Sequence, residues 1–264
     1  MKITVQEVID TIIEPVGRLE DTVDTLVCGS PETEVTGIAT AFMPTRRVIE
    51  QAAERGANLV IAHEGLFFAH RDETVPGREG EVLEEKRRFL NEAGVAVFRC
   101  HDYWHRVKPD GITAGLIEEL GWTPYVRVQQ PAASVLDIPT ATLAEIAERV
   151  KERLGLSSVR AIGAAEEVFS RLGVLVGYRG GASLAVPLFE QEGAELVLYG
   201  EGQEWETPEY VREAIDQGKK KALLVIGHAE SEEPGMKALA KRLGERFPSL
   251  PVFHLRERPL FRTI

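Results

Sequence analysis

Three short apolar runs in the sequence each end in histidine and acidic residues. The runs and the polar residues that follow them are 58–62 with His63 and Glu64, 94–100 with His101, Asp102 and His105, and 222–227 with His228 and Glu232. An apolar run of this length between turn residues is typical of a strand buried on both faces of a parallel sheet. The carboxyl ends of such strands border the crevice where open α/β sheets bind ligands. We therefore expect these polar side chains to share one site.

Strand and helix patterns alternate along the whole chain. A strand at 35–42, a helix from Pro44 to Gly56 and the strand at 58–62 predict a strand–helix–strand unit, whose parallel strands need a crossover helix. The extended segment 126–140 separates this material from a second series of strands and helices. With 264 residues, the chain can form one large domain or two modest ones. The predicted fold class is α/β.

Composition excludes several classes of partner. The formal net charge of −11 argues against non-specific binding of nucleic acid, which depends on Lys and Arg neutralising phosphates. Only Cys28 and Cys100 are present, so we expect reduced thiols and no disulfide framework. The charged N-terminus does not resemble a signal peptide, and no apolar run approaches the roughly 20 residues of a spanning helix. We expect a cytoplasmic protein with no membrane partner.

His63 and Glu64 are open to two interpretations. Adjacent residues on a regular strand point to opposite faces, so both can serve one site only if the backbone turns at Gly65. Otherwise His63 is a buried structural histidine and Glu64 a loop acid. The same alternatives apply to His101, Asp102 and His105.

His228 and Glu232 carry a sharper signal. Ser231 is a candidate helix N-cap, and Glu232 would then be explained by the helix dipole alone. The concentration of histidines at strand ends favours metal binding instead. Imidazole and carboxylate ligands suit Zn, Mn, Fe, Co or Ni, and five or more ligands would suit two ions sharing a bridging carboxylate. The candidate metal ligands are His63, Glu64, Asp102, His105, His228 and Glu232.

These motifs resemble the Nif-three-like dinuclear metal-centre family, some members of which are named type-two GTP cyclohydrolase I. The motifs are the strand 35–42 followed by a helix and His63-Glu64-Gly65, then His101 and His105 before a helix ending near Gly121, and finally Gly227, His228 and Glu232. The resemblance implies two α/β lobes with mainly parallel sheets flanked by helices, and a metal site at strand ends between the lobes. We assign residues 1–125 and 220–264 to the first lobe and 126–219 to the second. It also implies a ring-like homohexamer.

By this resemblance, His63, His228 and Glu232 are metal ligands, with Glu232 as a bridge. The sequence departs from the family pattern at three places. Glu64 replaces a second histidine, and His105 stands where the family has an aspartate, for which Asp102 is an alternative. The loop 200–205 lacks the histidine that the family carries there.

The expected function is hydrolysis of a small polar or nucleotide-like substrate by metal-bound hydroxide, with one or two divalent ions per chain. The alternative is a metal carrier or sensor, or an oligomeric interaction scaffold, without catalysis. A third interpretation is an α/β protein whose metal site has decayed. The sequence leaves the metal, the substrate and the reaction open.

Overall fold

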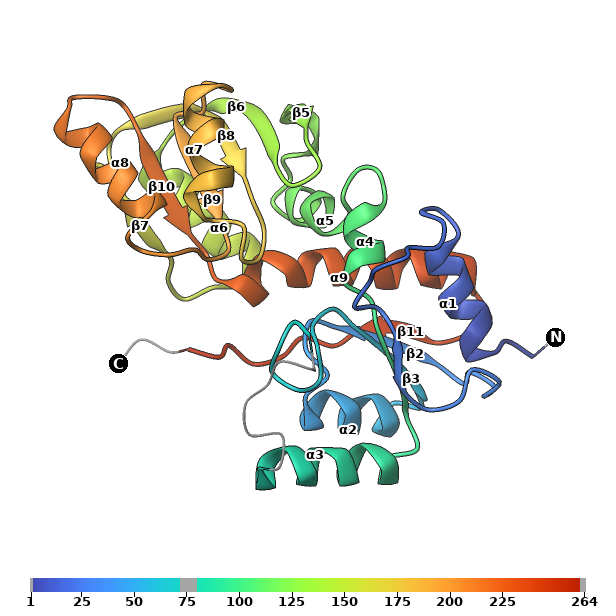
Figure 1. Ribbon diagram of the computed structural model, residues 1–264. Coiled ribbons are helices and arrows are strands. Elements are labelled where there is room, and N and C mark those ends of the chain that lie inside the picture. Colours follow the sequence, from blue (N-terminus) through green and yellow to red (C-terminus); the bar gives the residue numbers. More distant parts are fainter. Residues whose placement is uncertain (1, 72–79, 262–264) are drawn as a thin grey trace. The chain divides into compact units, whose positions relative to one another are not determined.

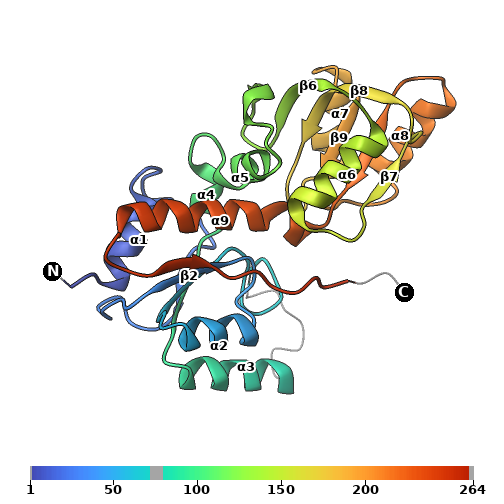
Figure 2. The same ribbon diagram turned by 180° about the vertical axis from the view of Figure 1, so that it is seen from behind.

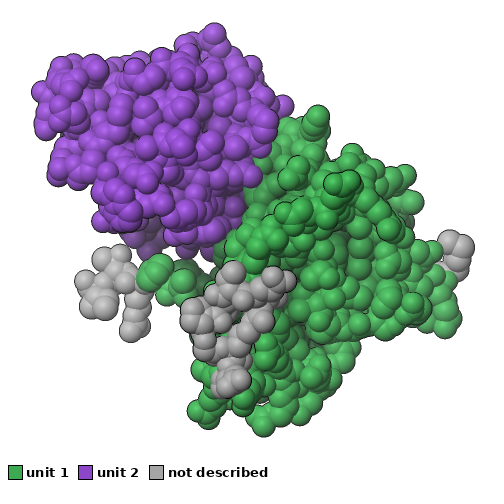
Figure 3. All heavy atoms as spheres, viewed as in Figure 1, with its two compact units in different colours: residues 1–111, 236–262 green, residues 112–235, 263–264 purple. Residues whose placement is uncertain are grey.

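The computed structural model describes residues 2–71 and 80–261, which fall into two compact units (Figure 3). Unit 1 comprises the described residues up to Gly111 together with residues 236–261. Unit 2 is the continuous segment Ile112–Gly235. The boundaries therefore lie at 111/112 and 235/236, whereas the sequence-based division placed them at 125/126 and 219/220. Among the described residues, no helix is both long and apolar enough to cross a membrane.

Unit 1 is built on a five-stranded sheet (Figure 1). Its order is β1 (Leu26–Cys28), β4 (Ala96–Arg99), β3 (Leu59–Ala62), β2 (Ile38–Ala41) and β11 (Val252–His254). All neighbouring pairs are parallel except β1 with β4. Every residue of β2, β3 and β4 is buried, as expected for apolar strands covered on both faces.

Helices cover both faces of this sheet. Figures 1 and 2 show α2 (Arg46–Glu54) and α3 (Glu81–Glu92) on one face of this sheet. On the other face lie α1 (Val5–Ile13) and residues 236–246 of α9 (His228–Arg246), a helix whose first eight residues belong to unit 2. The hydroxyl of Thr45 accepts a hydrogen bond from an amide in the first turn of α2, which explains why that helix starts there. The short helix α4 (Asp102–Arg106) directly follows the end of β4.

Unit 2 contains a six-stranded sheet of mixed direction. Its order is β5 (Val126–Gln129), β6 (Ser134–Thr142), β8 (Val168–Val174), β9 (Leu196–Tyr199), β10 (Ala222–Val225) and β7 (Arg160–Ile162). Only β8, β9 and β10 are parallel neighbours, and the remaining pairs are antiparallel. Thus β10, which the sequence-based division assigned to the first lobe, pairs within the second sheet.

The helices of unit 2 are also divided between the two faces of their sheet. Figures 1 and 2 show α6 (Leu143–Leu154) on one face and α7 (Ala182–Glu190) with α8 (Thr207–Asp216) on the other. The remaining helical elements are α5 (Gly111–Glu119) and the 3-10 turn η2 (Thr123–Tyr125). The overall class is α/β with two sheets flanked by helices, which confirms the predicted fold class. The expectation of mainly parallel sheets holds for unit 1 but not for unit 2, where three of the five strand pairs are antiparallel.

Candidate metal centre

Three histidines of unit 1 meet at the carboxyl ends of β3 and β4. His63 follows β3, His101 follows β4, and His105 lies one turn further on in α4. Because β3 and β4 are parallel neighbours, their carboxyl ends lie side by side. The His63 and His101 rings are stacked with centroids 4.6 Å apart. The His105 ring stands edge-on to both, at 5.0 and 4.9 Å.

Each of these rings is held through its Nδ1 atom by an oxygen. Nδ1 of His63 lies 3.2 Å from the carbonyl oxygen of Cys100. Nδ1 of His101 lies 3.0 Å from Asp102 Oδ1, and Nδ1 of His105 lies 3.0 and 3.1 Å from the two oxygens of Asp110. With a proton on Nδ1 donated to these oxygens, a neutral imidazole has its lone pair on Nε2. This is the arrangement in which proteins present histidine to metal ions.

The three histidines offer donor atoms close enough to share an ion. One ligand atom from each of His63, His101 and His105 lies within 4.8 Å of the others. The imidazole set, with its oxygen partners behind the rings, suits Zn, Co, Ni, Fe or Cu. The residues present therefore fit a divalent metal of this kind.

Asp102, which we expected as a possible ligand, holds His101 in place. Its second oxygen accepts hydrogen bonds from the Thr22 hydroxyl at 2.9 Å and the Val23 amide at 3.1 Å. Burial alone would raise the pKa of Asp102, but the hydrogen bonds from His101, Val23 and Thr22 hold it well below its usual range. Asp102 is thus an ionised carboxylate on the Nδ1 side of His101.

Asp24 anchors the start of α4, a role that no pattern in the sequence indicated. One of its oxygens accepts hydrogen bonds from the amides of His101 and Asp102, and the other from the amide of Tyr103. These are amides that a helix N-terminus leaves without intrahelical partners. Burial raises the pKa of Asp24, against the opposing effect of these amides. Asp24 thereby sets the direction in which α4 leaves β4.

Glu64 lies beside the histidines and forms an ion pair with Arg99. The guanidinium of Arg99, whose side chain is 4% exposed, lies 3.2 Å from Glu64 Oε2 and donates to the carbonyl of His70 at 2.6 Å. The other oxygen of Glu64 is 4.0 Å from Nε2 of His101. Glu64, His70 and His101 also offer ligand atoms within 4.8 Å of one another. Glu64 therefore remains within reach of a metal ion, with part of its charge already balanced.

Unit 2 holds the second group of expected ligands. His228 is the first residue of α9, and its Nδ1 lies 2.8 Å from Oε1 of Glu201. Its Nε2 lies 3.1 Å from Oε2 of Glu232, whose side chain is 3% exposed. Glu201 was not among the expected ligands, although it follows a buried strand, β9.

Ser231 is not the N-cap of α9. The helix begins at His228, and the Ser231 hydroxyl accepts a hydrogen bond from the amide of Gly177 while donating to the carbonyl of His228. The prediction that Ser231 caps this helix is therefore wrong.

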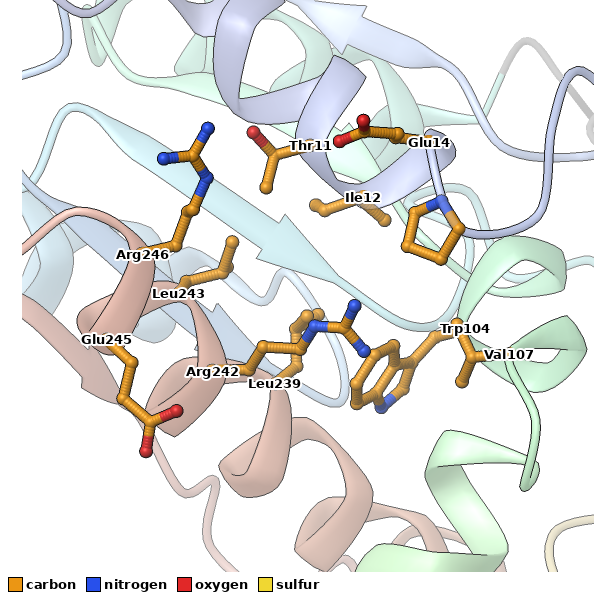
Figure 4. A pocket seen from close by; sticks show the side chains of 11 residues that line it. Thr11, Ile12, Glu14, Trp104, Val107, Leu239, Arg242, Leu243, Glu245 and Arg246 are labelled. Atoms are coloured by element: carbon orange, nitrogen blue, oxygen red, sulfur yellow. The ribbon is translucent and has the colours of Figure 1, made fainter.

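A separate pocket of unit 1 contains none of these donors. It is lined by side chains of α1, α4 and α9, among them Ile12, Trp104, Leu243 and two arginines (Figure 4). Trp104 connects this pocket to the metal centre, because it lies in α4 between His101 and His105. The guanidinium of Arg242 lies over the Trp104 ring, 5.7 Å from its centre.

Comparisons with known proteins agree with the resemblance seen in the sequence. A Clostridium perfringens protein named GTP cyclohydrolase 1 type 2 homolog is 27% identical over 236 residues, which are 85% of this chain and 84% of that protein. A Bacillus cereus protein related to NIF3 superposes on 100% of this chain and 99% of its own, with a TM-score of 0.79 at 13% identity. A Staphylococcus aureus hypothetical protein covers 100% of both chains, with a TM-score of 0.74 at 18% identity. These two structures show a shared fold.

A family model also matches nearly the whole chain. The model of the family described as Duf34/NIF3 (NGG1p interacting factor 3) matches residues 4–259, nearly the whole of the 264-residue sequence. The chain belongs to the Duf34/NIF3 family.

Proposed function

We propose that this protein binds divalent metal through His63, His101 and His105 and is a metal-dependent hydrolase of a small polar or nucleotide-like substrate. The observation that carries the proposal is that the three rings meet at one place and that each is held at Nδ1 by an oxygen. A histidine with a purely structural role does not need two other histidines beside it and an oxygen at each Nδ1. One ligand atom of each ring lies within 4.8 Å of the others, although each ring has its own oxygen partner.

A divalent ion held by these rings would supply Lewis acidity and lower the pKa of water bound to it. The protein's own residues prepare this chemistry by fixing the donors. Asp24 holds the start of α4, and Asp102 holds the ring of His101. Glu64 is a further candidate ligand, with Arg99 keeping its carboxylate in place. These contacts give the centre its geometry before any ion binds.

His228 and Glu232 are proposed as a second pair of donors, within unit 2. An imidazole and a carboxylate whose donor atoms are 3.1 Å apart combine two ligand types that borderline divalent metals accept. Glu201 lies behind His228 and would orient its ring as Asp102 orients that of His101. Binding at both groups would give two ions per chain.

The nucleotide-like substrate is supported by the name of the relatives. The Clostridium perfringens protein is called a GTP cyclohydrolase 1 type 2 homolog, and GTP is therefore the first substrate to test. The alternative function, a metal carrier or sensor without catalysis, uses the same donors. The homohexamer and the cytoplasmic location likewise stay predictions, and light scattering after size exclusion tests the first.

The deciding experiment is metal content by mass spectrometry on tag-free protein, followed by turnover of GTP, phosphoesters and cyclic amides. We would compare wild type with His105→Ala and His228→Ala. His254→Ala is the matched control, because His254 lies in β11 and its Nδ1 contacts Thr40. We expect the first two variants to lose metal and activity, and the control to keep both.

The outcomes separate the proposed functions. Metal binding that depends on His105 or His228, without turnover of any substrate class, would favour the carrier or sensor. No binding of Zn, Mn, Fe, Co or Ni by wild type would overturn both proposals.

A further inference from the structure

We propose that Asp110 is a positioning residue of the unit 1 metal centre, which holds His105 so that its Nε2 faces His63 and His101. The inference rests on the proposed metal binding and adds a residue that does not touch the ion. Asp110 lies in the turn after α4, five residues beyond His105.

The contact between Asp110 and His105 is close and shielded from solvent. Both carboxylate oxygens lie within hydrogen-bond distance of Nδ1, at 3.0 and 3.1 Å. The two side chains are 6% and 9% exposed. A buried charge-assisted hydrogen bond of this kind is stronger than one in water. It keeps the proton on Nδ1, opposes a flip of the ring and makes Nε2 a better electron donor.

The packing of Trp104 brings Asp110 to this place. Gly111 follows Asp110, and a Cβ atom there would lie 2.5 Å from Cε2 and 2.7 Å from Cδ2 of the Trp104 ring. The ring is therefore in direct contact with the Gly111 backbone. On α9, Arg242 lies over the same ring (Figure 4). Trp104 is 6% exposed, so the turn that carries Asp110 packs against a buried ring that its neighbours hold in place.

Asp110 is a cleaner test of this idea than Asp102. Asp102 also binds Thr22 and the Val23 amide, so its substitution would loosen the segment before β1 as well. At Asp110, replacement by asparagine preserves the shape and one acceptor oxygen while removing the charge. Replacement by alanine removes both.

The experiment measures metal affinity and ligand geometry on the full-length protein. Zn²⁺ affinity would be determined by competition with a chromogenic chelator, and the visible absorption spectrum recorded with Co²⁺. The variants are Asp110→Asn and Asp110→Ala, with Asp10→Asn as the control, an aspartate of α1 that binds Gln6. The unfolding temperature of each metal-free protein shows separately whether the fold has changed.

We expect Asp110→Asn to weaken Zn²⁺ binding about 10-fold and Asp110→Ala up to about 100-fold, the usual range for a residue behind a metal ligand. The Co²⁺ spectrum should shift in both variants, and the control should match wild type. Gly111→Ala keeps the carboxylate of Asp110 but pushes the adjoining backbone away from the Trp104 ring, so it should weaken binding in the same direction.

Failure of this proposal differs from failure of the proposed function. Wild type that binds neither Zn²⁺ nor Co²⁺ would overturn both. Wild type that binds them, with Asp110→Asn unchanged in affinity and in spectrum, would overturn the role of Asp110 alone. If Asp110→Ala does not fold, the near-isosteric Asp110→Asn still decides the outcome. A lower unfolding temperature with unchanged affinity and spectrum would make Asp110 merely structural and refute the proposal.

Discussion

Gly177 is where one added methyl group should disturb the donors of unit 2. The residue has a φ of +56°, which only glycine adopts at little cost. A Cβ atom there would lie 2.1 Å from Oε1 of Glu232 and 3.1 Å from Nε2 of His228. Gly177→Ala therefore has to displace the Glu232 carboxylate from its contact with His228.

The expected loss of stability has two parts. A left-handed backbone costs about 1–2 kcal/mol for a residue with a Cβ. Forcing a Cβ atom into the filled space beside the buried Glu232 carboxylate costs about 1–3 kcal/mol, so the free energy of unfolding should fall by roughly 2–5 kcal/mol in total. Gly218→Ala is the matched control. Gly218 has a φ of +75° with no atom within 4 Å of the added Cβ, so only the backbone part applies.

Thermal unfolding of the metal-free proteins and metal content after reloading would test this reasoning. Each kcal/mol lowers the unfolding temperature of a protein of this size by about 2–4 °C. We expect Gly177→Ala to unfold several degrees below Gly218→Ala and to lose metal at the His228 group. Equal unfolding temperatures with equal metal content would show that Glu232 does not depend on the space at Gly177.

Three further predictions concern the framework around the two groups of donors. Asp24→Ala should lower the unfolding free energy of the metal-free protein by about 0.5–2 kcal/mol, the usual cost of losing an N-cap. Urea unfolding measures this change, and an unchanged urea midpoint would contradict the role of Asp24 at the start of α4. Gly115→Ala should also destabilise, because a Cβ there would lie 2.5 Å from Cα of Gly235. The overpacking cost of about 1–3 kcal/mol is at least as large as the gain of about 1 kcal/mol in helix propensity, and a raised unfolding temperature would refute the close approach of the two backbones. Glu195 has a lowered pKa: burial would raise it, but Lys220 and backbone amides outweigh burial. The ionised Glu195 therefore stabilises the fold above its unfolded-state pKa near 4.5, and this stabilisation is lost as the pH falls below that value. The difference in unfolding free energy between wild type and Glu195→Gln should shrink from about pH 7 to about pH 3. A difference that stays constant would contradict the interactions assigned to Glu195.

The strands that end in histidines were predictable because burial on both faces leaves a strong local pattern. β3, β4 and β10 coincide with the apolar runs that preceded His63, His101 and His228. The pairing of β10 was not predictable in the same way. A buried strand has the same composition in either sheet, and its neighbours β9 and β7 are chosen by the packing of the whole unit.

The donors themselves were only partly accessible to sequence reasoning. His63 and His105 were expected, and the structure places their rings 5.0 Å apart. Asp24 lies 77 residues before the His101 amide that it binds, and no local pattern encodes such a contact. His101 and Asp102 are adjacent in the sequence. Only the structure at the start of α4 shows that the His101 ring stacks on His63 and that Asp102 contacts Nδ1 of His101. Whether these donors bind metal stays a prediction.

The pairing of β11 with β2 has a consequence for how the protein is made. The sheet of unit 1 gains its last strand from residues 252–254, whereas its other strands lie before residue 100. Unit 2 is a continuous segment, so it can fold while the ribosome is still synthesising the chain. Until the C-terminal segment emerges, β2 is an edge with exposed backbone donors and acceptors, open to pairing with another chain. The nascent protein should therefore need β11, or a chaperone, to escape aggregation.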